Sequence, residues 1–163
     1  MFLSSQCVCR IGIGTARARL TGLAGGGWLA MACAAAYQDG LDQLLWAWPP
    51  EGTPARPSLT GAHFLDPIHR PGSTIVGMRW EATGFAGRPF PALDANITLT
   101  AEGGQHTQIT LTGVYRSPLG PPGAGLDRLL LHQAATAAVG SLLTRLTGAL
   151  EEAARAPGNP ATP

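Results

Sequence analysis

The sequence predicts a two-layer α+β domain in which an antiparallel sheet packs one face against a long C-terminal helix. Three observations predict this fold class. Between residues 51 and 116, apolar residues recur at every second position, as in half-buried strands. Short glycine-containing turns connect these segments, which favours antiparallel pairing. Between residues 126 and 155, apolar residues recur at helical spacing, so the two apolar surfaces must cover each other.

Composition and length are those of one domain with a neutral surface. The chain has 163 residues, of which 13% are charged, and its 11 basic residues are all Arg against 10 acidic residues. One core of useful size fits this length without disulfides or metal. The formal net charge of +1 argues against a nucleic-acid binder, which would carry a basic stripe, and against an acidic disordered chain.

The first third of the chain is the least regular. Residues 1–13 show no clear period, so we expect a poorly ordered extension there. Thr15–Leu20 alternates between apolar and polar residues, which predicts a half-buried strand. Gly25–Trp48 has a helical composition, and Gly40 predicts a break between two short helices. Pro49-Pro50 ends the second of them.

An apolar run at Leu20–Ala36 follows three arginines and resembles a secretion signal. Four glycines dilute the run, and at this length it is too weak for a membrane span. The three cysteines are Cys7, Cys9 and Cys33, an odd number that forms no disulfide framework and no zinc motif. We therefore expect reduced thiols and a cytoplasmic protein, with a cleaved signal within residues 1–36 as the alternative.

Strands are expected over the middle of the chain. The alternation predicts them at Ser58–Leu65, Ser73–Thr83, Leu93–Ala101 and Thr107–Tyr115. Glu102-Gly103-Gly104 is typical of a hairpin turn, and Gly84–Pro91 is a turn-rich connection.

The C-terminal part begins with a linker rich in Pro and Gly at Ser117–Gly125. The helical stripe then runs over Leu126–Arg155, and the Pro/Gly tail at 156–163 is expected to be disordered. The predicted domain therefore spans residues 14–155.

Four segments carry a resemblance to a known family. Arg79–Gly84, Phe90–Ala95, Gly113–Gly120 and Leu126–Arg128 resemble the START-like superfamily, also called SRPBCC, in its small single-domain actinobacterial form. The resemblance implies a helix-grip fold, in which a curved antiparallel sheet wraps a long terminal helix around an apolar cavity. Relatives bind lipids, polyketides or other hydrophobic molecules, and a minority are cyclases or dehydratases. The superfamily shares no catalytic set, so none is transferred to this chain.

The predicted cavity is lined by inward-facing residues of the sheet and the helix. They are Val76, Met78, Trp80, Ile97, Leu99, Ile109, Leu111 and Tyr115 from the strands and Leu130, Ala134 and Val139 from the helix. Small residues favour an empty space: Ala95 and Gly113 on the sheet, and the alanine-rich run at 134–138. The alternative is that the same residues form a filled core.

Polar candidates within the predicted cavity are few. Tyr115 and His132 are the acid or base groups of an enzyme, if the chain is one. Phe85 and Phe90, on a glycine-rich connection, are a predicted gate. His63 and His69 fit no metal signature, and the chain shows no nucleotide, Gly-x-Ser-x-Gly or HExxH motif, so we expect no metal and no cofactor.

The predicted function is binding of a hydrophobic small molecule, lipid-like or polyketide-like, between sheet and helix. The alternatives are a polyketide cyclase/dehydratase-type enzyme and an interaction or structural protein with a filled core. We expect a monomer or weak homodimer that has no nucleic-acid partner and no membrane span.

Overall fold

The computed structural model of the chain describes residues 1–47, 58–83, 89–116 and 124–155. The elements in chain order are β1 (Phe2–Cys9), α1 (Ile13–Gly25), α2 (Trp28–Ala47), β2 (Ser58–Phe64), β3 (Ile68–Arg70), β4 (Ser73–Thr83), β5 (Pro89–Ala101), β6 (Thr107–Arg116) and α3 (Ala124–Arg155). This is the predicted order of a strand, two helices, a run of strands and a long C-terminal helix, and the α+β helix-grip fold is confirmed.

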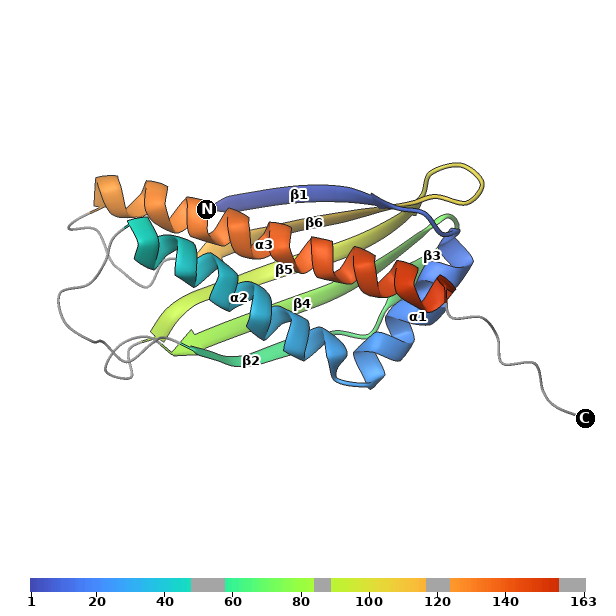
Figure 1. Cartoon of the computed structure of the whole chain (residues 1–163), viewed down its shortest axis with the longest axis horizontal. Coiled ribbons are helices and arrows are strands. Elements are labelled where there is room, and N and C mark those ends of the chain that lie inside the picture. The colour runs from blue at the N-terminus through green and yellow to red at the C-terminus, as the bar shows by residue number, and fades with distance from the viewer. Residues whose placement is uncertain (48–57, 84–88, 117–123, 156–163) are drawn as a thin grey trace, which may run out of the picture.

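The strands form one antiparallel sheet in the order β1-β6-β5-β4-β2, with β3 paired to β4. The long helix α3 and the helix α2 lie on the same face of this sheet (Figure 1). The sequence predicts α3 as the cover of the sheet, whereas the structure divides the cover between two helices that pack against each other. Each helix buries one flank against the sheet and one against its neighbour.

Two predictions for the N-terminal part are wrong. The first strand lies at Phe2–Cys9, within the region expected to lack structure, and it pairs with β6 in unbroken register. Its inward positions include Ser5, so its alternation is too weak to identify. Residues Thr15–Leu20, predicted as a strand, belong to α1, where Ala16 and Leu20 are buried at helical spacing and Ala18 is exposed.

The predicted break at Gly40 is also wrong, because α2 runs through it without interruption. The glycine instead allows α2 and α3 to approach each other closely. A Cβ atom built on Gly40 would lie 2.5 Å from the carbonyl oxygen of Ala134 and 2.8 Å from the Cβ of Ala138, both on α3. Neither atom belongs to a flexible side chain, so no larger residue fits here without moving a helix.

The strand predictions in the middle of the chain agree with the structure to within a few residues. Strand β4 has the predicted bounds, whereas β5 begins at Pro89, earlier than predicted, and the three-residue β3 was not predicted. Residues 84–88 of the predicted turn, most of the predicted linker at 117–125, and the predicted tail at 156–163 lie outside the described residues.

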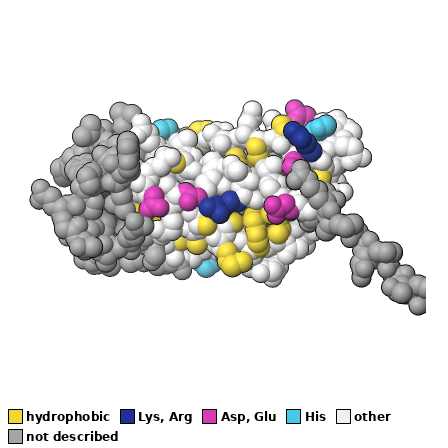
Figure 2. Space-filling model, viewed as in Figure 1, with side chains coloured by type: hydrophobic (Ala, Val, Ile, Leu, Met, Phe, Trp, Pro, Cys, Tyr) yellow, Lys and Arg dark blue, Asp and Glu magenta, His cyan; other side chains and the backbone are white. Residues whose placement is uncertain are grey.

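Charged side chains fasten the helices to the sheet and to each other. Arg17 of α1 donates from its guanidinium to the carbonyl oxygens of Arg70 and Ser73, at 2.7 Å each. On the surface of the helix layer, Asp39 of α2 accepts hydrogen bonds from Ser141 and Arg145 of α3, and these bonds lower the pKa of the Asp39 carboxyl. Figure 2 shows that charged side chains are otherwise sparse on this face, as the composition indicates.

The apolar run at residues 20–36 contributes to the core, since Leu20, Leu29 and Cys33 are all buried. Within the described part of the chain no single helix is long and apolar enough to cross a membrane, and α1 with α2 passes that test only as a pair bent by 83°.

Candidate ligand site between the sheet and the two helices

The inner face of the sheet is arranged in rows that run across the strands. The pairing registers place Met78, Ala95 and Gly113 in one row and Trp80, Leu93 and Tyr115 in the next. These rows lie toward the end of the sheet where β4 ends and α3 begins, opposite the β3–β4 turn (Figure 1). We call this part of the interior the Tyr115 end.

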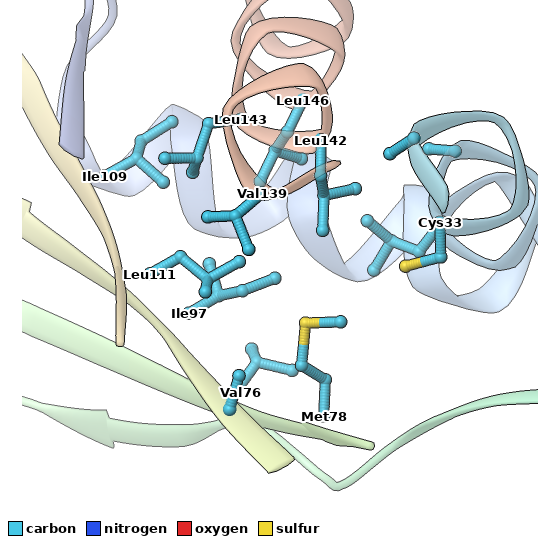
Figure 3. Close-up of a cluster of buried hydrophobic side chains, with 14 of the residues drawn as sticks. Cys33, Val76, Met78, Ile97, Ile109, Leu111, Val139, Leu142, Leu143 and Leu146 are labelled. Carbon is cyan, nitrogen blue, oxygen red and sulfur yellow. The ribbon is translucent and has the colours of Figure 1, made fainter. Parts of the chain in front are cut away.

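At the opposite end the interior is filled. The side chains of Ile97, Leu99, Ile109 and Leu111 are completely buried beneath Leu142, Leu146 and Leu150 of α3, as Figure 3 shows for most of them. Val76 and Val139 are only 1% exposed. Six of the predicted cavity residues are therefore in contact with core side chains: Val76, Ile97, Leu99, Ile109, Leu111 and Val139. We call this part the packed end.

Several buried residues of the Tyr115 end retain a small accessible surface, although Leu93 in the same row retains none. Trp80 and Met78 retain 3% and 4% of their surface, and Ala95 and Tyr115 each retain 7%. Across from the sheet, Tyr37 of α2 retains 8% and Ala135 of α3 retains 7%. Met78, Trp80, Ala95, Tyr115 and Ala135 belong to the same hydrophobic core as the residues of the packed end.

Two tyrosines give this apolar region its polar groups. Burial raises the pKa of both Tyr37 and Tyr115, and the proximity of Tyr37 raises the pKa of Tyr115 further. Both hydroxyls therefore stay protonated at neutral pH and can donate a hydrogen bond. These are the only two tyrosines of the chain.

His132 lies on the same stripe of α3 as the buried Val139, Leu146 and Leu150, because these positions follow it by about two, four and five helical turns. Its Nδ1 atom is buried and has no hydrogen-bond partner among the described residues. The predicted acid or base candidates thus lie on elements that face each other across the interior.

The alanine-rich segment of α3 has a second role that the sequence did not reveal. Ala134 and Ala138 meet Gly40 of α2, so these small residues allow the two helices to approach closely. Within the segment, Ala135 and Ala138 are buried and retain 7% and 4% of their surface. The small residues of the sheet are themselves close neighbours: a Cβ atom on Gly113 would lie 2.7 Å from the Cβ of Ala95.

Three predicted residues cannot be placed in the site. Phe85 lies outside the described residues, and the side chains of Phe90 in β5 and Leu130 in α3 are also outside them. Their roles as gate and lining stay predictions.

Sequence reasoning missed Tyr37. A usable signal exists, because Cys33, Ala36, Tyr37, Gly40 and Leu41 follow the i, i+3, i+4, i+7, i+8 spacing of a helix face and are all buried. The assumed break at Gly40 concealed this continuous face.

The cysteines form no disulfide. Burial raises the pKa of the Cys33 thiol to about 12, and the pKa values of the Cys7 and Cys9 thiols are also raised by burial. No group of three or more potential metal ligands occurs in the part of the chain that the structure describes. The Nδ1 atom of His69 instead lies 3.1 Å from the hydroxyl oxygen of Thr74, and the two are hydrogen-bonded.

A hollow of about 540 Å³ lies on the outer face of the sheet, and Met78, Ala95 and Gly113 also contribute to its lining. Its lining includes Phe2, Leu65, Arg79, Asn96 and Val114, and it is open to solvent. Arg79 bonds Glu81 at 2.8 Å there and lies 3.7 Å from Asp94. The charges that the sequence places near the family-like motifs therefore pair with each other on the outer face.

The chain resembles solved structures of the same architecture at low sequence identity. A conserved protein from Geobacillus kaustophilus is 12% identical over 94% of this chain and 97% of that chain, with a TM-score of 0.51. Zhui aromatase/cyclase from Streptomyces sp. R1128 is 12% identical over 98% of both chains, with a TM-score of 0.49. Ara h 8.0201 is 10% identical over 93% of this chain and 98% of that chain, with a TM-score of 0.41. No protein-family model and no curated protein matches the chain.

The likeness to the Geobacillus kaustophilus protein shows a shared fold. The topology of the chain, a curved antiparallel sheet with a long C-terminal helix on one face, is the predicted helix-grip fold.

Proposed function

We propose that the protein binds a hydrophobic small molecule at the Tyr115 end of the space between the sheet and the helices α2 and α3. One observation carries the proposal. Six buried residues from five strands and helices retain 3–8% of their surface at this end, whereas the residues named for the packed end retain at most 1%. The resemblance to START-like proteins supports the same location.

The surroundings define what such a ligand needs. Met78, Trp80, Ala95 and Ala135 offer apolar contacts, and each Å² of apolar surface that the ligand removes from water contributes roughly 25 cal/mol. The hydroxyls of Tyr37 and Tyr115 are donors at neutral pH. A mainly apolar molecule with an oxygen acceptor therefore matches this end of the interior.

The experiment measures binding of 1-anilinonaphthalene-8-sulfonate by fluorescence and of a long-chain fatty acid by native mass spectrometry. Ala135→Leu fills space at the Tyr115 end and should weaken both by roughly ten-fold. Ala30→Leu on the exposed face of α2 is the matched control and should leave both unchanged. Equal affinity in the wild type and Ala135→Leu, or absence of binding to the wild type, would refute the proposal.

A cyclase- or dehydratase-type enzyme is the second candidate, and the buried, unpartnered Nδ1 of His132 favours it. An imidazole nitrogen that makes no hydrogen bond to the described residues is available to exchange a proton with a bound substrate. If an aromatic polyketide is turned over, His132→Ala and Tyr115→Phe should each lower kcat by roughly ten-fold or more. Unchanged turnover in both variants would exclude these two residues as acid or base.

A further inference from the structure

The two edges of the sheet differ in how they are protected from pairing with another strand. At one edge, β2 contains a register shift between Leu59 and Gly61, Pro67 follows it, and β3 has three residues. Bulges, prolines and short strands are the usual protections of an edge. At the other edge, β1 is the last strand, has eight residues in unbroken register, and contains no charge and no proline.

Alternate residues of β1 form backbone hydrogen bonds with β6, and the backbone groups of the residues between them face outward. Met1 and Tyr115 exchange two backbone hydrogen bonds, each of 2.7 Å. In an antiparallel ladder such pairs recur at every second residue, so Leu3, Ser5, Cys7 and Cys9 direct their backbone groups to β6. The backbone groups of Phe2, Ser4, Gln6 and Val8 then point away from the sheet.

The side chains of β1 have a palindromic pattern centred on Ser5. Phe2 matches Val8, Leu3 matches Cys7, and Ser4 matches Gln6 in polarity. An antiparallel copy with Ser5 opposite Ser5 therefore places apolar beside apolar and polar beside polar residues. The same register pairs Phe2 with Val8 and Ser4 with Gln6. The backbone groups of these residues point away from the sheet, so they can form hydrogen bonds with the second copy. Phe2 and Val8, which are 66% and 48% exposed, would cover each other.

The flank of α3 above β1 leaves room for a second copy. Thr147 on this flank contacts the Cys7 sulfur at 3.0 Å, and Thr136, Gly140 and Thr144 precede it on the same side of the helix. A Cβ atom on Gly140 would meet nothing within 4 Å. No large side chain from these four positions would separate two α3 helices placed side by side.

We propose that two copies of the chain associate through β1, edge to edge and antiparallel about a two-fold axis at Ser5, to form one continuous sheet. Such an interface is isologous, and it closes at two copies because the opposite edge is protected. The inference is independent of the proposed ligand site, which lies inside each copy.

A pair of double variants tests the register on the full chain. In the proposed dimer Ser4 of one copy lies opposite Gln6 of the other, so S4K/Q6K places like charges opposite each other twice, whereas S4K/Q6E places opposite charges there. Their neighbours on β6 are Thr112 and Thr110, so neither variant disturbs a charge within the sheet. Sedimentation equilibrium should give twice the chain mass of 16.8 kDa for the wild type and S4K/Q6E. S4K/Q6K should have a dissociation constant at least about ten-fold higher than S4K/Q6E.

Disulfide trapping gives a second measurement that does not depend on affinity. Ser5→Cys places two cysteines opposite each other across the axis and should give a covalent dimer on oxidation. Ser4→Cys is the control, because its copies are offset by two residues and are too far apart to bridge. Circular dichroism and the unfolding midpoint confirm that each variant is folded. The proposal is overturned if the wild type has the mass of one chain up to millimolar concentration, if both double variants associate equally, or if Ser4→Cys cross-links as readily as Ser5→Cys.

Discussion

The packed end and the Tyr115 end belong to the same two layers but differ in the side chains that meet there. At the packed end, Ile97, Leu99, Ile109 and Leu111 meet leucines of α3 and leave no accessible surface. At the Tyr115 end, the sheet presents Ala95 and Gly113, and α3 presents Ala135. The comparison shows that one continuous helix and one continuous sheet meet through large side chains at one end and include several small residues at the other.

Truncation at the packed end should give the largest effect. Leu146 is completely buried, so Leu146→Ala removes contacts and leaves a cavity, and we expect a loss of about 2–5 kcal/mol in the free energy of unfolding. Urea denaturation measures it. Tyr115→Phe at the other end removes only a hydroxyl and should cost less than about 1.5 kcal/mol. A smaller loss for Leu146→Ala than for Tyr115→Phe would reverse the comparison.

Replacement of alanine by leucine should destabilise the protein at a completely buried position but not at the Tyr115 end. Ala36 of α2 is completely buried, whereas Ala135 retains 7% exposure. Ala36→Leu should therefore lower the free energy of unfolding by about 1–3 kcal/mol, because overpacking forces side chains out of their rotamers. Ala135→Leu should leave it unchanged or raise it slightly. The thermal midpoint of each variant is the measurement, and equal losses would show that the Tyr115 end is filled.

The contact between α2 and α3 limits the width of the space. Gly40→Ala places a methyl group 2.5 Å from the carbonyl oxygen of Ala134, so the helices must separate. We expect a net loss of roughly 1–2 kcal/mol in the free energy of unfolding, after a gain of about 1 kcal/mol from helix propensity.

Gly22→Ala in α1 is the control for Gly40→Ala, since its new methyl group meets nothing within 4 Å. It should stabilise the protein by up to about 1 kcal/mol. Chemical denaturation of both variants checks the difference, and stabilisation by Gly40→Ala would contradict the close helix contact.

Alkaline titration followed by tyrosinate absorbance reports on the two tyrosines, while the buried thiols of Cys7, Cys9 and Cys33, whose pKa values are also raised, contribute to the loss of stability at high pH. Burial raises the pKa of both tyrosines in the folded state above the value of about 10 in the unfolded chain. The folded state then keeps protons that the unfolded state releases. The stabilisation from this difference is complete below about pH 10 and decreases as pH rises toward the folded-state pKa values.

Tyrosinate absorbance and far-UV circular dichroism, recorded together, measure this titration. Both signals should change in one transition, because ionisation follows unfolding. Tyrosinate absorbance that rises near pH 10 while the fold persists would mean that water reaches the hydroxyls freely.

Much of the sheet could be predicted from the sequence, because residues such as Ser73–Thr83 alternate clearly between a buried and an exposed face. The N-terminal elements could not. Ala16 and Leu20 fit both an alternating and a helical pattern in a short window, and β1 has Ser5 inward and Phe2 and Val8 outward. For the candidate site, Tyr115 was predicted from its position on the inward face of its strand and His132 from its acid–base chemistry, while Tyr37 was missed because the assumed break at Gly40 divided its helix.

The sequence by itself determined the fold class, the β4, β5 and β6 strands and the stripe of α3, because these depend on the local period of apolar residues. The tertiary structure decided the remainder. Gly40 allows α3 to approach α2 and does not end its helix, and Ala134 and Ala138 are the alanines that touch it. These roles depend on contacts between residues about 100 positions apart. How closely the inward-facing residues pack depends on the sizes of side chains that meet across two layers, and no local period encodes that meeting.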